Sequence, residues 1–166
     1  MTETEPTLYL DGLHMNQWPR PNQLDQFFGK IDYHNNGTPC LRWEARSLVD
    51  IGTPFTLRLA WQTSMTTRKI RCARAVRASL GRILSAIWNA YGRDELAVRA
   101  NNINLFWGCY VPAEGALRAG GLSLHSRGAA IRIGPKETPQ VIRDAFEAEG
   151  WVMNKGTEGQ FYAGKF

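Results

Sequence analysis

Residues 122–135 hold the side chains with the clearest chemical potential in this chain. They read LSLHSRGAAIRIGP, in which Ser123 and His125 begin the pattern S-x-H-x-x-G-x-A. The imidazole of His125 could ligate a metal ion, or it could make a hydrogen bond within a core. Seven residues later comes Arg132, whose guanidinium stays protonated near neutral pH and has no lone pair to donate. A metal ion on His125 would therefore meet a positive charge rather than a second ligand.

The same stretch resembles the first metal motif, S-x-H-x-x-G-x-A-x-D, of the bacterial and phage zinc peptidases that cut peptidoglycan stem peptides. That family comprises D-alanyl-D-alanine carboxypeptidases and L-alanyl-D-glutamate endopeptidases. The resemblance implies one zinc ligand at His125, a second at the position of Arg132, and a binding role for Ser123. A catalytic zinc takes about three protein ligands and keeps one position for the water that it activates. Because Arg132 stands where the family has aspartate, we expect that ligand to be lost.

The tail of the chain resembles the closing segment of the same family, where a helix ending in F-x-x-x-G-W leads to D-x-x-H-F. Aligned on Phe161, the family's second zinc histidine is Gln160 and its general base is Thr157. An amide is a poor zinc ligand, and a threonine cannot take a proton from metal-bound water near pH 7. Glu158, one residue along, is the best candidate for a surviving acid. We expect Arg132 to be solvated or paired with an acid, and Glu158 is the first choice.

The resemblance covers about residues 45–166, in the same order and with similar spacing. Besides the two motifs it includes PFTLRLAW, a helix ending in YG, and LFWGCY. It implies a substrate-binding arginine ahead of the first motif, for which Arg118 is the counterpart. It also implies an α+β fold, a small and mostly antiparallel sheet flanked by helices, as in the Hedgehog N-terminal domain. We expect residues 21–166 to form this single peptidase-like domain, preceded by an N-terminal arm over residues 1–20.

Three functions are compatible with these losses, and we rank them in order. The first is a catalytically inactive peptidase-like domain that serves as a structural or binding module, such as a tail or baseplate component of a phage or prophage virion. The second is a metal-free binder of peptidoglycan stem peptides or anionic polymer. The third is an active, endolysin-like zinc peptidase with a relocated metal site, for which only His14 and His34 remain as further histidines. We expect no cofactor, or zinc under the third hypothesis. The expected partners are other virion proteins or cell-wall polymer.

Composition limits the class of protein. The 166 residues are 43% hydrophobic and include six tryptophans, enough for a folded core. The net charge of +5 allows anionic partners without selecting one. No run reaches the ~18 apolar residues of a membrane helix, and the start lacks a signal-peptide pattern. We expect the protein on a virion, or in the bacterial cytoplasm before release. The three cysteines show no C-x-x-C spacing, so we expect mostly buried, reduced thiols.

Hydrophobic patterning predicts the elements that position these residues. Helices are expected over residues 22–28, 67–91 and 138–149. Strands are expected over residues 55–61, 96–99, 103–110, 129–133, 151–153 and 160–163, with turns at 32–39 and 52–54.

The predicted helix over residues 67–91 carries a cationic face opposite its apolar face, and no acid occurs over residues 66–89. Such a face could bind phosphate or an acidic protein, or could be solvated. No aromatic residue lies among the arginines to stack on bases, so nucleic acid is not expected as a partner. The arginines of this predicted partner surface are Arg68, Arg71, Arg74 and Arg82.

Overall fold

A six-stranded mixed sheet runs through the structure, a computed structural model that describes residues 18–112 and 124–164. The strand order is β2-β1-β3-β4-β6-β5, so β2 and β5 form the two edges. β1 and β3 are parallel, and the other neighbouring pairs are antiparallel. The strands are β1 (Leu48–Leu59), β2 (Gln62–Ala73), β3 (Leu105–Gly108), β4 (Ala130–Ile133), β5 (Val152–Met153) and β6 (Gln160–Tyr162). The predicted α+β class and mostly antiparallel sheet are confirmed.

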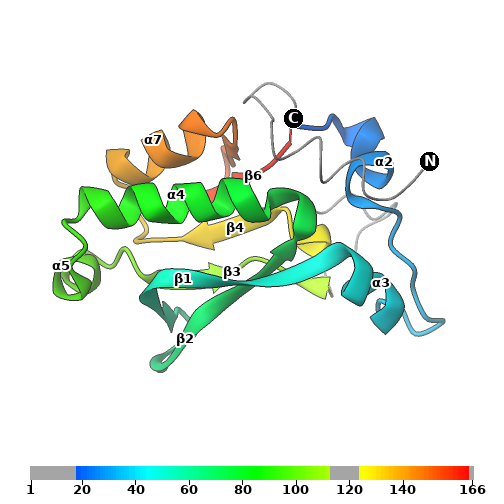
Figure 1. Ribbon diagram of the computed structural model, residues 1–166, viewed down its shortest axis with the longest axis horizontal. Coiled ribbons are helices and arrows are strands. Elements are labelled where there is room, and N and C mark those ends of the chain that lie inside the picture. Colours follow the sequence, from blue (N-terminus) through cyan, green and yellow to red (C-terminus); the bar gives the residue numbers. More distant parts are fainter. Residues whose placement is uncertain (1–17, 113–123, 165–166) are drawn as a thin grey trace.

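Two helices cover one face of this sheet (Figure 1). α4 (Arg77–Ala90) lies along the strands, and α7 (Gln140–Ala148) lies beside α4. Apolar residues recur on α4 at helical spacing, and they bury one side of it in the core. These residues are Leu80, Ile83, Leu84 and Ile87. The shorter helical elements are η1 (Pro21–Gln23), α2 (Leu24–Phe28), α3 (Leu41–Ser47), η2 (Arg74–Val76), α5 (Glu95–Ala100) and η4 (His125–Arg127).

On β4 and β6, the side chains of Arg132, Gln160 and Tyr162 are partly exposed, and their neighbours Ile131, Ile133 and Phe161 are buried. The ring of Phe146 on α7 stacks on Phe161 with centroids 4.0 Å apart. This contact places the buried side of both strands against the helices. Successive side chains of a strand point to opposite faces. Arg132, between the two buried isoleucines, therefore projects from the face that α4 and α7 leave uncovered.

The predicted helix over residues 67–91 is wrong in its first half. β2 extends to Ala73 and pairs with β1 in a hairpin, and α4 begins only at Arg77. The segment TSMTTRK favours a strand, because β-branched side chains lose rotamer freedom in a helix. Ile70 fits a helical period in the sequence, but it lies opposite Ile51 of β1 and is buried there. Pairing between strands therefore decides the structure of this segment.

Two further predictions along this part of the chain are wrong. β1 continues through residues 52–54, and its register with β2 is irregular between Gly52 and Leu57. Such an irregularity suits Pro54, which cannot donate a ladder hydrogen bond. Residues 96–99 belong to helix α5 rather than to a strand. Asp94 caps that helix, since its carboxylate accepts a hydrogen bond from the Leu96 N–H at 2.9 Å.

The remaining predicted elements are confirmed, with small shifts at their ends. The helix near residues 22–28 ends at Gly29, whose φ of 86° suits glycine. The turn over residues 32–39 is closed by a bridge between Tyr33 and Pro39. The later predicted elements appear as β3, β4, α7, β5 and β6. Within the described ranges, no helix is long and apolar enough to cross a membrane.

Trp18, the first described residue, joins the N-terminal segment to the core. Its side chain is 5% exposed, and its indole N–H donates to the carbonyl of Glu149 at 2.6 Å. Of the predicted arm over residues 1–20, residues 1–17 lie outside the described residues, whereas Trp18 packs in the core.

Candidate functional site

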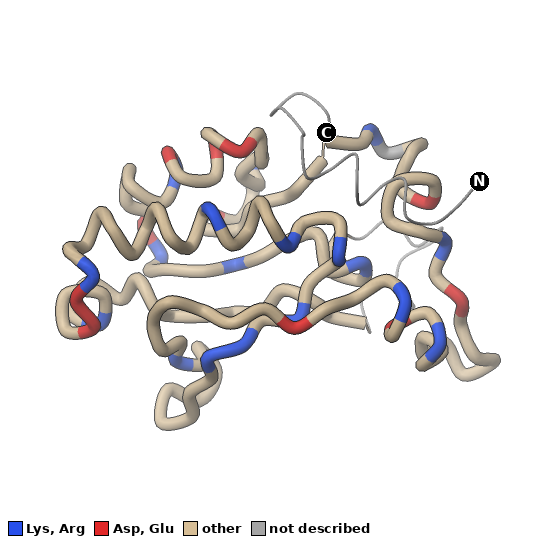
Figure 2. The backbone as a smooth tube through the Cα atoms, viewed as in Figure 1, with Lys and Arg blue, Asp and Glu red and all other residues tan. Residues whose placement is uncertain are grey.

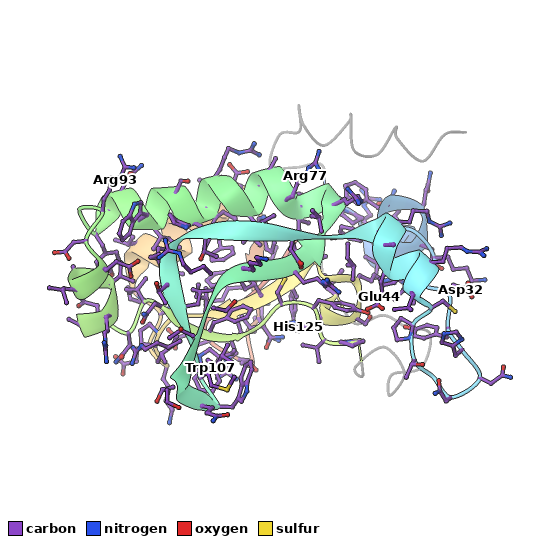
Figure 3. The ribbon with its side chains drawn as sticks, turned by 60° about the horizontal axis from the view of Figure 1, so that its bottom comes forward. Asp32, Glu44, Arg77, Arg93, Trp107 and His125 are labelled. Carbon is purple, nitrogen blue, oxygen red and sulfur yellow. The ribbon has the colours of Figure 1, made fainter. Side chains whose placement is uncertain are left out.

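The register between β4 and β6 brings together the positions that the sequence motifs singled out. Arg132 lies directly opposite Gln160, so both side chains project from the same face of the sheet. The Gln160 amide nitrogen, Nε2, is 2.7 Å from Nε2 of His125, which lies in η4 just before β4. His125 and Trp107, the latter on β3, can be located by their labels in Figure 3. Segments far apart in the sequence thus meet at one point.

Both ring nitrogens of His125 are engaged in hydrogen bonds. Nδ1 is 2.8 Å from the carbonyl oxygen of Cys109, which can only accept, so Nδ1 carries the proton. In the neutral ring Nε2 is then the acceptor, and the Gln160 amide donates to it. The side chain is 6% exposed. His125 is therefore a buried, hydrogen-bonded histidine whose only lone pair faces an N–H donor.

Backbone contacts hold His125 in place. The short helix η4 ends at Gly128, whose φ of 72° lies in the left-handed region. The His125 carbonyl accepts from the N–H of Gly128 at 3.2 Å and from that of Val111 at 2.9 Å. The residue types H-x-x-G, from His125 to Gly128, thus serve a turn that leads from the histidine into β4.

Arg132 packs on an aromatic ring that the sequence motifs did not reveal. The central carbon of its guanidinium lies 4.2 Å from the centroid of the Trp107 ring. Trp107 is fixed in turn by a hydrogen bond from its indole N–H to the carbonyl of Gly134 at 3.2 Å. Gly108, the β3 residue opposite Arg132, adds no side chain beside the guanidinium. Both Arg132 and Trp107 are partly buried.

The predicted pairing of Arg132 with Glu158 is wrong, because a different arginine holds that carboxylate. Arg143 of α7 donates to Glu158 at 2.5 Å, and the backbone N–H of Thr138 donates to it at 2.9 Å. The hydrogen bond from Thr138 and the charge of Arg143 lower the pKa of Glu158. Thr157 supplies only its carbonyl, which accepts from the Gln160 N–H at 3.3 Å. Glu158 thus joins the last loop to α7.

Two neighbours of Gln160 complete the arrangement. Its amide also donates to the hydroxyl of Tyr162 at 3.1 Å, and Asn154 donates to the same hydroxyl at 2.6 Å. The ring of Tyr162 meets the imidazole of His125 edge-on, with centroids 6.4 Å apart. The sequence held a signal for Tyr162, since residues two apart on a strand share a face. It held none for Trp107, whose position depends on the pairing of β3 with β4.

The predicted partner surface of four arginines does not exist as one helix face. Arg68 and Arg71 lie on β2, Arg74 lies in η2, and only Arg82 lies on α4. Figure 2 shows Lys and Arg spread along these elements. Each arginine also makes contacts within the fold. The partners are Glu95 for Arg68, Asp50 for Arg71, the carbonyls of Ala45 and Arg46 for Arg74, and Glu149 for Arg82.

The cysteines are free thiols, as predicted. Cys72 and Cys109 are buried, and burial raises the pKa of the Cys72 thiol to about 12. Cys40 is half-buried, with its sulfur 3.6 Å from Nδ1 of His34. No group of three or more His, Cys, Asp and Glu side chains suited to a metal ion occurs in the part of the chain that is described. The predicted binding residues Ser123 and Arg118, and also His14, lie outside it.

Comparisons of the chain with protein-family models, with curated proteins and with solved structures found no match. The chemistry of the site therefore has to be inferred from its own geometry. Its donors do not fit zinc: Arg132 is a cation, and the lone pair of His125 accepts a hydrogen bond from Gln160. What the site offers is a guanidinium on an aromatic ring, beside a neutral imidazole, an amide and a phenol.

Proposed function

We propose that this chain is a catalytically inactive relative of the zinc peptidoglycan peptidases, used as a structural or binding module. The observation that carries the proposal is the convergence of His125, Arg132 and Gln160. These three residues occupy the positions of the family's zinc ligands in the resemblance. Their meeting across β4 and β6 supports an inherited site, and with it the Hedgehog-like version of the α+β fold.

The residue types at these positions favour loss of catalysis. A zinc ion at this point would lie beside the guanidinium of Arg132 and would compete with the amide of Gln160 for the lone pair of His125. Glu158 could not replace the general base without leaving Arg143 and Thr138. We therefore rank an active, endolysin-like peptidase last. A metal-free binder of stem peptides or of wall polymer ranks second.

The part played in a larger assembly is a proposal that rests on the resemblance to the phage and prophage branch. A tail or baseplate protein of a virion fits a module that keeps its fold without its chemistry, and a fold alone does not identify a function. Other virion proteins would then be its partners, with cell-wall polymer as the alternative.

Restoring the lost ligands tests the inherited site directly. The parent protein should bind no stoichiometric zinc by elemental analysis and should release no fragments from purified sacculi. The double variant Arg132→Asp with Gln160→His should bind about one zinc ion per chain, because His125, a carboxylate and a second imidazole would then face one point. A matched control, Arg99→Asp with Gln62→His, makes the same exchanges at exposed positions on α5 and β2.

The outcomes separate the three functions. Zinc in the double variant alone supports the proposal. Stoichiometric zinc in the parent, or lysis of sacculi that chelation abolishes, would establish the peptidase instead. Equal zinc uptake by the double variant and the matched control would show that the three positions form no common site.

A further inference from the structure

We propose that Arg132 and Trp107 form a binding site for the carboxylate group of a ligand. The inference rests on the proposed function in one respect, since it names the ligand class of the same altered site. A guanidinium now stands where the resemblance placed a zinc-binding aspartate, so the sign of the charge at that position is reversed. Such a site no longer suits a cation and instead attracts an anion.

The stacking of Arg132 leaves its hydrogen-bond donors available. Trp107 shields one face of the guanidinium, while the N–H groups of a guanidinium point outward in its own plane. Among residues 18–112 and 124–164, no carboxylate or carbonyl accepts a hydrogen bond from Arg132. This differs from Arg143, whose side chain is bound to Glu158 and to the carbonyl of Thr138. The flat face of the Arg132 guanidinium thus packs on Trp107, and the N–H groups at its edge are available to a ligand.

The surroundings match a singly charged group. Beside Arg132 lie the neutral imidazole of His125, the amide of Gln160 and the hydroxyl of Tyr162. Among these four described side chains, the guanidinium of Arg132 carries the formal positive charge, which a carboxylate balances and a phosphate dianion exceeds. The planar fork of a guanidinium also matches the two oxygens of a carboxylate. On the β3 side, the residue opposite Arg132 is Gly108, which has no side chain of its own.

Nuclear magnetic resonance of the whole, nitrogen-labelled protein can test this site with small probes. We would titrate N-acetylalanine, its uncharged amide N-acetylalaninamide, and inorganic phosphate at constant ionic strength. The reporters are the indole N–H of Trp107 and the Nε–H of Arg132. The acid should shift both signals saturably, the amide should shift neither, and phosphate should bind more weakly than the acid.

Variants assign the effect to the guanidinium. Arg132→Gln should weaken binding of the acid about tenfold or more, because a charge-assisted hydrogen bond contributes more than the ~1.4 kcal/mol that equals a factor of ten. Arg132→Lys keeps the charge without the planar fork, so it should weaken binding too. It also serves as the second variant if Arg132→Gln does not fold. Arg99→Gln, at an exposed position on α5, should bind like the parent.

Four results would overturn the inference: shifts that do not saturate, equal shifts with the amide, tighter binding of phosphate, or parental affinity in both Arg132 variants. The zinc and sacculus assays test the proposed function separately. A chain that binds neither zinc nor carboxylate would keep the proposed function and lose this inference. A chain that binds zinc would lose the proposed function whatever the titrations show.

Discussion

Gly128 lies very close to neighbouring backbone, which makes Gly128→Ala a sharp test of the packing beneath the site. A Cβ there would lie 2.6 Å from the Ala73 nitrogen and 2.9 Å from the Cys72 carbonyl carbon. Its φ of 72° also costs a residue with a side chain about 1–2 kcal/mol. Overpacking against backbone adds about 1–3 kcal/mol, since backbone cannot rotate away as a side chain can. The free energy of unfolding should therefore fall by about 2–5 kcal/mol.

Urea unfolding at equilibrium measures this loss, and Gly81→Ala supplies the matched control. Gly81 lies inside α4, and a Cβ there would meet nothing within 4 Å. Alanine at that position should raise the free energy of unfolding by about 0.5–1 kcal/mol, because glycine gains more backbone entropy on unfolding. For a chain of this length, the melting temperature of Gly128→Ala should fall by roughly 4–20 °C. A Gly128→Ala protein as stable as the parent would refute the close approach of η4 to the end of β2.

Two further predictions follow from the ionisable groups. The pKa of Glu158 is lower in the folded state than in the unfolded chain. The hydrogen bonds of Glu158 therefore stabilise the fold at a pH above the ordinary pKa of glutamate, and this stabilisation is lost as the pH falls through the lowered pKa. Glu158→Gln should therefore lower the free energy of unfolding near pH 7, as measured by urea unfolding, and this difference from the parent should disappear in acid. A difference in the free energy of unfolding that does not depend on pH would contradict the assignment. A disulfide reagent at pH 8 should label Cys40 in the native protein well before Cys72 and Cys109, because burial suppresses both thiolates, and all three should react at once in denaturant. Rapid labelling of all three in the native state would show that these two thiols are not buried.

The convergence of the site could be expected from the sequence, because its parts lie on short elements with clear patterns. The alternation in AIRI places Arg132 apart from its two buried neighbours, and the turn formed by Gly128 sets His125 just ahead of the strand. The tail pattern then identified Gln160 as the residue to be matched with them. Local periods place each residue on its own element, and the expectation that the three positions lie together came from the two motifs of the family that the chain resembles.

The predictions that failed concern contacts between segments that lie far apart in the sequence. The alternation that makes β2 a strand is weak, and only its pairing with β1 distinguishes it from a continuation of α4. The partner of Arg132 could not be read either, since Trp107 reaches it through the pairing of β3 with β4. Charge alone suggested Glu158 as the partner of Arg132, but Glu158 forms its ion pair with Arg143 of α7. Opposite charges in a sequence thus suggest which residues could pair, but they do not show which of them lie close together in the fold.

The position of β2 at the edge of the sheet has a consequence for self-association. An edge strand presents unpaired backbone groups to solvent. The exposed side chain of Trp61 comes just before β2, and that of Met65 lies within it. A long edge next to apolar residues is the kind of surface on which chains aggregate. Here Arg68, Lys69 and Arg71 follow in the same strand, so a second copy added edge to edge would bring like charges together. Two arginines of the predicted partner surface, Arg68 and Arg71, should therefore oppose aggregation at this edge, and salt that screens their charge should weaken that protection.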